Sequence, residues 1–208
     1  APKLKPYLSL ANHVGQLGGQ ILESGIKAID IRYSGAITQV NTRPITASIL
    51  AAILAAVSEH VNLVNAPMIA KAQKIAVTDS YQADMGDLPV AIEVKITCEA
   101  GVHDVVGTLF AGSEPRIVRI EGVPIEAALS QNMLLIKNDD KPGMIGALGT
   151  LLADAGCNIA DFRLGRISSG GTAVALVALD SRVDDRLFQK IEAIPQIRQA
   201  RRLSIASA

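Results

Sequence analysis

The stretch Asn138–Ile159, NDDKPGMIGALGTLLADAGCNI, places two carboxylates and a Pro-Gly turn directly before an apolar segment with helical spacing. A free amino acid presents an ammonium and a carboxylate. Asp140 can bind an ammonium through a charge-assisted hydrogen bond. The free backbone N–H groups of Gly143, Met144 and Ile145, at a helix N-terminus, favour an anion. The stretch therefore predicts a binding site for a small molecule that carries both charges.

A second polar turn, Gly156-Cys157-Asn158, closes the same helical segment. The Asn158 amide offers one acceptor and two donors. The intervening helix, residues 143–155, is about 20 Å long at 1.5 Å per residue. One chain therefore cannot bring Asp140 and Asn158 onto one small ligand, whereas two paired chains can. We interpret the two turns as halves of one site shared between two chains.

The residues alone leave an alternative for each turn. Asp139 and Asp140 could cap the helix and interact favourably with its dipole, without any ligand. Asn158 could serve only as a turn residue that tolerates a left-handed backbone.

The composition excludes several other classes of function. The chain has 208 residues, which suggests one or two domains, and 49% of them are hydrophobic but only 3% aromatic. Twenty Lys and Arg balance twenty Asp and Glu, so there is no electrostatic footprint of a nucleic-acid binder. The longest apolar run, residues 45–57, is too short to span a bilayer. Cys98 and Cys157 show no zinc spacing, and we interpret them as buried thiols of a cytoplasmic protein without a metal.

Residues 26–127 are expected to form one α/β unit. A strand over 26–35 is followed by an apolar helix over 41–61, a helix over 62–77 interrupted near Pro67, and strands over 89–99, 102–112 and 115–126, joined as an antiparallel meander. Residues 6–24 precede this unit as a helix that contains Gly15, Gly18 and Gly19. Each glycine costs roughly 1 kcal/mol of helix propensity, and we expect another helix to pack closely there.

The pattern changes after residue 130. Strands are predicted over 132–138, 158–168, 170–181 and 197–205, with helices over 143–155 and 183–194. The order βαββαβ predicts a ferredoxin-like plait over residues 131–206. The fold class is therefore α+β: an intervening α/β domain with an antiparallel sheet and two helices over 26–128, followed by the plait, with the boundary around 127–130.

Several motifs carry a family resemblance. The second domain resembles an ACT domain in the Asp140–Gly143 turn, the helix that follows it, the Gly-Cys-Asn-Ile turn at 156–159 and the hydrophobic hairpin strand Thr172–Leu179. Together with YLSLANHVGQLGGQI, NLVNAPMIA and EPRIVRIEG in that order, the whole chain is similar to the C-terminal regulatory region of long-type D-3-phosphoglycerate dehydrogenases. In that region an intervening, allosteric substrate-binding domain precedes an ACT domain.

The resemblance implies a regulatory and oligomerising role. The effector would be L-serine, bound between ACT domains by the positions matching Asp140 and Asn158 and causing feedback inhibition in a homo-oligomer. Asn138 falls where the family often has His or Tyr. Residues 1–25 would be the last helix of a preceding catalytic part, and Ala1 in place of Met is expected of a fragment or a processed chain. No GxGxxG turn follows a strand. We therefore expect NAD to bind elsewhere in the parent enzyme, and we expect no cofactor in this chain.

Arg116 and Arg119 form a second candidate site. Guanidinium groups suit phosphate and carboxylate recognition, and the family's intervening domain is associated with an anionic effector such as phosphoglycerate. The following residues, VPIEAAL, add no basic group or His. A solvated strand surface is the alternative.

Two other functions fit the same pair of domains. One is a stand-alone amino-acid sensor, and the other is a regulatory subunit of an L-serine dehydratase. The dehydratase chemistry needs iron–sulfur cysteines, for which two cysteines are too few. The helix over residues 6–24 favours the dehydrogenase, because a stand-alone sensor does not need it.

Overall fold

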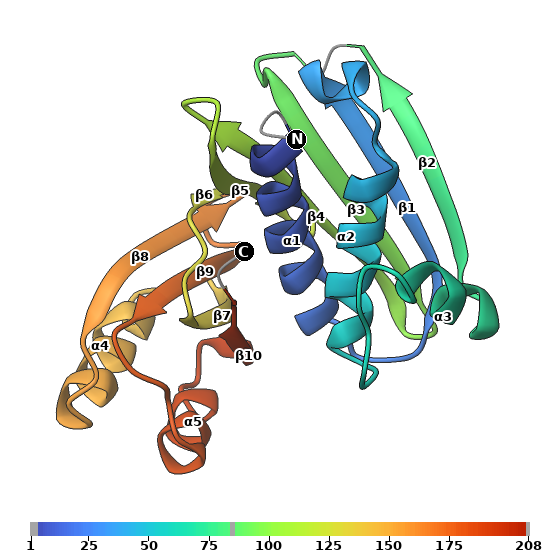
Figure 1. Ribbon diagram of the computed structural model, residues 1–208. Coiled ribbons are helices and arrows are strands. Elements are labelled where there is room, and N and C mark those ends of the chain that lie inside the picture. The colour runs from blue at the N-terminus through green and yellow to red at the C-terminus, as the bar shows by residue number, and fades with distance from the viewer. Residues whose placement is uncertain (1–3, 84–85, 207–208) are drawn as a thin grey trace. The chain divides into compact units, whose positions relative to one another are not determined.

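The computed structural model describes residues 4–83 and 86–206. Internal contacts divide the chain into two compact units, residues 1–122 and residues 123–207. The first unit holds five strands of a six-stranded sheet and the second holds a four-stranded sheet, coloured from blue to green and from yellow to red in Figure 1. The short strand β6 (Val123–Ala127) belongs to the second unit by its contacts and to the six-stranded sheet by its pairing. The α+β class that we predicted is confirmed.

The first sheet has the strand order β2-β1-β3-β4-β5-β6. β1 pairs in parallel with β2 and antiparallel with β3. The elements along this part of the chain are α1 (Lys5–Gln20), β1 (Ile26–Gly35), the 3-10 helix η2 (Ala36–Gln39), α2 (Arg43–Ala55), α3 (Ala66–Ala72), β2 (Ala76–Gln82), β3 (Val90–Cys98), β4 (Gly101–Phe110), β5 (Glu114–Ile120) and β6 (Val123–Ala127).

Helices α1 and α2 pack so closely that glycine is required between them. A Cβ added to Gly15 would lie 2.6 Å from the Cβ of Ala52, and one added to Gly19 would lie 2.6 Å from the carbonyl oxygen of Ile53. The glycines that weaken α1 as a helix thus allow its contact with α2. As expected from its composition, α2 is largely buried, with seven buried residues out of thirteen.

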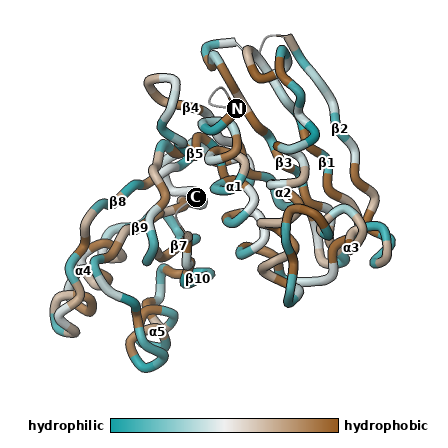
Figure 2. Tube along the Cα trace, in the orientation of Figure 1, coloured by the Kyte–Doolittle hydropathy of each residue, from teal (hydrophilic) through white to brown (hydrophobic). Residues whose placement is uncertain are grey.

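The two faces of the first sheet differ in chemistry because side chains alternate along each strand. The face towards α1 and α2 is apolar: Ile29, Ile31, Ile92 and Ile96 are at most 1% exposed. The opposite face carries charged side chains such as Arg32 and Glu93, which form an ion pair. In Figure 2 the apolar colouring follows β1 and β3, while β2 is paler.

The structure differs from several expectations in this unit. The sheet is mixed, because residues 76–82, predicted partly as helix and partly as loop, form β2 at its edge. Its sequence AVTDSYQ is polar and almost wholly exposed, so it lacks the apolar alternation that marks a strand. The predicted strand over 115–126 is two strands joined by a turn at Glu121-Gly122, where both residues have positive φ. The contact-based boundary falls at this turn.

The first helix is part of this unit. That residues 1–25 end a preceding catalytic part stays a prediction, and in this structure α1 packs on the first sheet. A Cβ added to Gly107 of β4 would lie 2.6 Å from Val14 and 2.8 Å from Leu10. The apolar stripe of α1 is thereby buried within residues 1–122.

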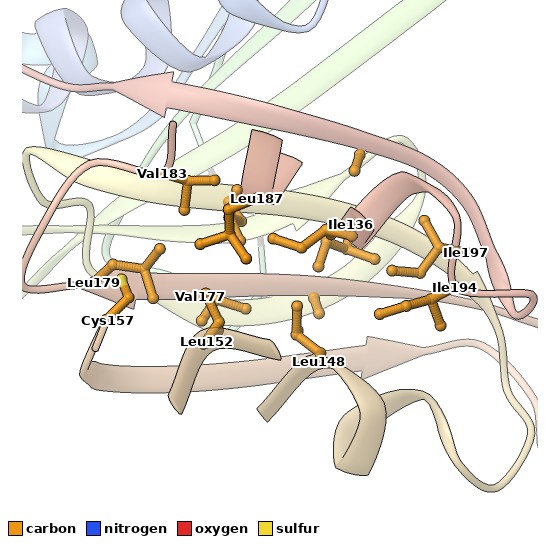
Figure 3. Close-up of a cluster of buried hydrophobic side chains, with 14 of the residues drawn as sticks. Ile136, Leu148, Leu152, Cys157, Val177, Leu179, Val183, Leu187, Ile194 and Ile197 are labelled. Carbon is orange, nitrogen blue, oxygen red and sulfur yellow. The ribbon is translucent and has the colours of Figure 1, made fainter. Parts of the chain in front are cut away.

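The second unit is the predicted βαββαβ plait. Its elements are β7 (Asn132–Asp139), α4 (Met144–Asp154), β8 (Ile159–Arg166), β9 (Thr172–Leu179), α5 (Asp185–Glu192) and β10 (Ile197–Ser204). The sheet order is β10-β7-β9-β8, with antiparallel pairs throughout. Figure 3 shows Leu148 and Leu152 of α4 facing Val177 of β9 inside the core between sheet and helices.

No described helix is both long and apolar enough to cross a membrane. Both cysteines are buried free thiols. Within residues 4–83 and 86–206, no group of three or more His, Cys, Asp and Glu side chains could hold a metal ion.

Candidate functional site

The turn between β7 and α4 is held by backbone hydrogen bonds on both sides. The N–H of Asp139 donates to the carbonyl of Gln196 at 2.9 Å, and the N–H of Asp140 donates to the carbonyl of Gly171 at 2.9 Å. Gly143 then takes φ 104°, a left-handed conformation that favours glycine. Backbone hydrogen bonds to Gln196, just before β10, and to Gly171, in the hairpin before β9, therefore fix the residues that precede α4.

Asp140 is a well-defined carboxylate at this turn. Nη1 of Arg166 donates to its Oδ2 at 2.6 Å, and the N–H of Gly170 donates to the same oxygen at 3.0 Å. These two contacts, first the Arg166 hydrogen bond and then that from Gly170, lower the pKa of Asp140 below its usual value. The side chain is 16% exposed. Because both contacts use Oδ2, Oδ1 is left to accept a further donor.

Asp139 points to a different partner. Its Oδ1 accepts from Nε of Arg198 at 2.9 Å, and this hydrogen bond is the main cause that lowers the pKa of Asp139. No side chain caps the N-terminus of α4. The capping alternative for the two aspartates is therefore wrong in this structure, since both carboxylates bind arginines.

The first turn of α4 presents its backbone beside Asp140. The first four N–H groups of an α-helix lack partners within the helix. Met144 turns its side chain into the core, where it is 2% exposed, whereas the Ile145 side chain is 53% exposed. The side-chain amide of Gln196 donates to the carbonyl of Pro142 at 3.1 Å and lies close to Gly143. Met144 can thus offer a ligand only its backbone N–H, while Ile145 can add apolar contact.

Asn138 contributes a buried amide next to this turn. By strand alternation it shares a face of β7 with the core residues Leu134 and Ile136. Its side chain is 3% exposed and its Nδ2 donates to the carbonyl of Asp139 at 2.9 Å. Its Oδ1 is buried without a hydrogen-bond partner among the described residues. A buried polar atom without a partner is uncommon and costs stability, so this oxygen is a candidate ligand acceptor.

Asn158 lies beyond the other end of α4. Its Nδ2 donates to Oδ2 of Asp180 at 2.7 Å. The eleven residues of α4 span about 16 Å, and so the structure does not bring Asn158 together with Asp140 in one chain. The two remain predicted halves of a site that needs a second chain.

Arg116 and Arg119 lie on the polar face of the first sheet, but both are already paired. Arg119 donates to Glu93 at 2.7 Å and to Asp104 at 3.2 Å. Arg116 donates to Glu114 at 2.9 Å, and its guanidinium lies 5.4 Å from the ring centroid of Phe110. These carboxylates neutralise the guanidinium groups that an anion would need.

The sequence did not identify three residues at the turn before and the turn after α4. Arg166, Gln196 and Asp180 each contact a predicted site residue from a distant part of the chain. Only the register of the antiparallel sheet reveals these contacts. A single sequence carries no signal for them, because an isolated Arg or Gln at a strand end is common.

Comparison with known proteins yields two family matches. Residues 3–121 match the D-3-phosphoglycerate dehydrogenase intervening domain. Residues 132–196 match the ACT domain. These matches confirm the resemblance that the motifs indicated.

Curated relatives are similar over nearly the whole chain. The chain is 32% identical over 200 residues to a D-3-phosphoglycerate dehydrogenase of Synechocystis sp., covering 95% of this chain and 36% of the relative. It is 33% identical over 199 residues to that of Methanocaldococcus jannaschii, covering 94% and 37%. It is 30% identical over 196 residues to that of Bacillus subtilis, covering 94% and 37%. The chain thus spans little more than a third of each relative's length.

Proposed function

Because the chain belongs to the family of the D-3-phosphoglycerate dehydrogenase intervening domain and carries an ACT domain after it, we propose that it senses L-serine and regulates a phosphoglycerate dehydrogenase of L-serine biosynthesis by feedback inhibition. The parent enzyme would use NAD in the cytoplasm, and its chemistry would lie outside this chain. The names of the relatives support the dehydrogenase over a stand-alone sensor or an L-serine dehydratase subunit.

One observation carries the proposal: the ionised carboxylate of Asp140 lies beside an uncapped helix N-terminus. Oδ1 of Asp140 accepts the ammonium of L-serine. The N–H groups of Gly143, Met144 and Ile145 surround the ligand carboxylate, where the helix dipole favours negative charge. The buried Oδ1 of Asn138 is a second acceptor for the ammonium.

The remaining part of the ligand requires a partner chain. Asn158 of a second copy supplies its amide, once its hydrogen bond to Asp180 opens or is shared. Strand β8 lies at one end of the four-stranded order, and β6 packs against it near Gly165. Pairing two ACT units would cover what β6 leaves open of this edge. The proposed unit of sensing is therefore a homo-oligomer.

Calorimetric titration of the chain with L-serine tests the site. Asp140→Ala removes a charged partner of the ammonium, so we expect a roughly 10- to 100-fold loss of affinity. Asn158→Ala removes a neutral hydrogen bond and should cost about 3- to 10-fold. Asp154→Ala, at the exposed end of α4, is the charge-matched control and should change affinity less than about twofold. Absence of binding by the unmodified chain at millimolar L-serine overturns the proposal.

Mixing the two defective variants tests whether the site is shared. In a mixed dimer of Asp140→Ala and Asn158→Ala chains, one site carries both substitutions and the other carries neither. We therefore expect equimolar mixing, with subunit exchange, to restore tight binding in a fraction of the sites. If each site lies within one chain, mixing restores nothing.

A further inference from the structure

A cavity of about 410 Å³ opens between α2, α3 and β2 of the first unit. In Figure 1 α3 lies at the end of β2 and contacts α2 on its other side. Leu50, Ala70, Ile75 and Val77 form an apolar wall. The volume lies within the range of small-molecule sites. Arg116, Arg119 and the residues around α4 take no part in it.

Three charged side chains line the same cavity without pairing. Arg43 comes from the first turn of α2, Lys71 from the last turn of α3 and Asp79 from β2. Among the described residues, neither cation has a carboxylate oxygen within 4.0 Å, whereas nine other basic side chains from Arg32 to Arg202 do, two of them histidines. Opposite charges are thus held apart around an apolar wall.

Asp79 is oriented by a chain of hydrogen bonds from the core. Thr46 donates its hydroxyl proton to Oδ2 of Asp79 at 3.0 Å. The hydroxyl of Tyr33 lies 2.7 Å from that of Thr46 and must donate, because the Thr46 proton is already used. Tyr33 is fully buried, and burial raises its pKa, which keeps this donor protonated. Oδ2 of Asp79 is fixed, while Oδ1 is left for another donor.

The motif NLVNAPMIA positions the α3 side of the cavity. Oδ1 of Asn62 accepts from the N–H groups of Val64 and Asn65, at 2.9 and 3.0 Å, and Oδ1 of Asn65 accepts from the N–H of Asn62 at 2.8 Å. This reciprocal arrangement fixes the start of α3, and Ala70 and Lys71 follow on its cavity side. The cavity walls are therefore built by ordered side-chain contacts.

We propose that this cavity binds a free α-amino acid with an aliphatic side chain. Asp79 accepts from the ammonium, Arg43 and Lys71 hold the carboxylate, and the hydrocarbon lies on Leu50 and Val77. A molecule that carries an ammonium and a carboxylate can pair with Asp79 and with the two cations at once. The site is a second one, in the first unit, and goes beyond the L-serine site proposed for α4.

L-Valine is the probe for this site. We expect saturable calorimetric binding to the 208-residue chain with a Kd of about 1 mM or tighter. Two analogues remove one charge each: 3-methylbutanoate lacks the ammonium and 2-methylpropylamine lacks the carboxylate. Each should bind at least about tenfold more weakly. Asp140→Ala should leave L-valine affinity unchanged, which separates this site from the one at α4.

Variants locate the binding. Ala47→Leu places a larger side chain in the cavity from α2 and should abolish L-valine binding, with a melting curve to show that the fold persists. Lys71→Gln and Asp79→Asn should each weaken it at least about fivefold. Lys95→Gln, on the opposite face of the sheet, removes the same charge and should have no effect. Absence of saturable L-valine binding, equal binding of 3-methylbutanoate, or full affinity in Ala47→Leu overturns the proposal.

Discussion

Arg166 and Asp140 form an ion pair with a donor–acceptor distance of 2.6 Å, although β8 and the β7–α4 turn are distant in sequence. The hairpin that follows β8 brings Gly170 to the same carboxylate oxygen. Arg166 and Gly170 thus hold in place the turn at which we propose that the ligand binds, and they do not need to touch the ligand.

Arg166→Gln should lower the melting temperature slightly at neutral pH, by about a few degrees at most, because exposed ion pairs contribute little. The pKa of Asp140 is depressed in the folded state. Its stabilising contribution is therefore present above the unfolded pKa of about 4 and is lost as pH falls through the folded pKa. We expect the difference in melting temperature between the unmodified chain and the variant to close between about pH 5 and pH 2. A difference that is constant over this range would contradict the assignment.

Asn138→Leu tests the role of the buried amide oxygen. The substitution removes an acceptor without a partner together with one hydrogen bond to the carbonyl of Asp139. These effects oppose each other, so the free energy of unfolding should change by no more than about 1 kcal/mol. If Oδ1 accepts from the ligand, affinity for L-serine should fall about 3- to 10-fold. Denaturant unfolding and calorimetry measure the two quantities, and unchanged affinity would exclude the contact.

The plait of the second unit could be predicted because its apolar periodicity is strong. Residues 144–154 repeat at helical spacing, and β7 and β9 are rich in Leu, Ile and Val. β2 could not be predicted, since its polar sequence becomes a strand only by pairing with β1. The apolar spacing of a sequence identifies a helix or strand that has a buried face of its own. A polar edge strand such as β2 forms only because a neighbouring strand pairs with it.

In the candidate site, too, part of the arrangement could be predicted from the sequence and part could not. The types and spacing of Asp140 and Gly143 were sufficient to locate the turn. The partners Arg166 and Gln196 depend on the register of β8 and β10, which a single sequence does not specify. The sequence also does not show that Asp140 binds an arginine instead of capping α4, because Arg166 reaches it only through the hairpin between β8 and β9.

Arg119→Gln tests whether the arginines of β5 serve the fold or an anion. The variant leaves Asp104 without its cation, while Glu93 keeps its ion pair with Arg32, so we expect a loss of about 1–2 kcal/mol in the free energy of unfolding. Arg116→Gln is the matched control, because its partner Glu114 is 58% exposed, and it should cost less than about 1 kcal/mol. Titration with 3-phosphoglycerate accompanies the unfolding curves. Binding that is lost in both variants, without loss of stability in Arg119→Gln, would support the anion site over the structural role.

Gly15→Ala tests the contact between α1 and α2. Alanine is the better helix former by roughly 1 kcal/mol, so an isolated helix would gain stability. In the structure the added Cβ would lie 2.6 Å from the Cβ of Ala52 and 2.8 Å from the carbonyl oxygen of Ile49. Backbone cannot yield as a flexible side chain does, and overpacking costs about 1–3 kcal/mol. We therefore expect a net decrease in the free energy of unfolding.

Gly146→Ala is the control, since an added Cβ there has no atom within 4 Å, and it should stabilise the chain by up to about 1 kcal/mol. Urea unfolding of both variants gives the signs, and stabilisation by Gly15→Ala would show that the helices do not pack this closely.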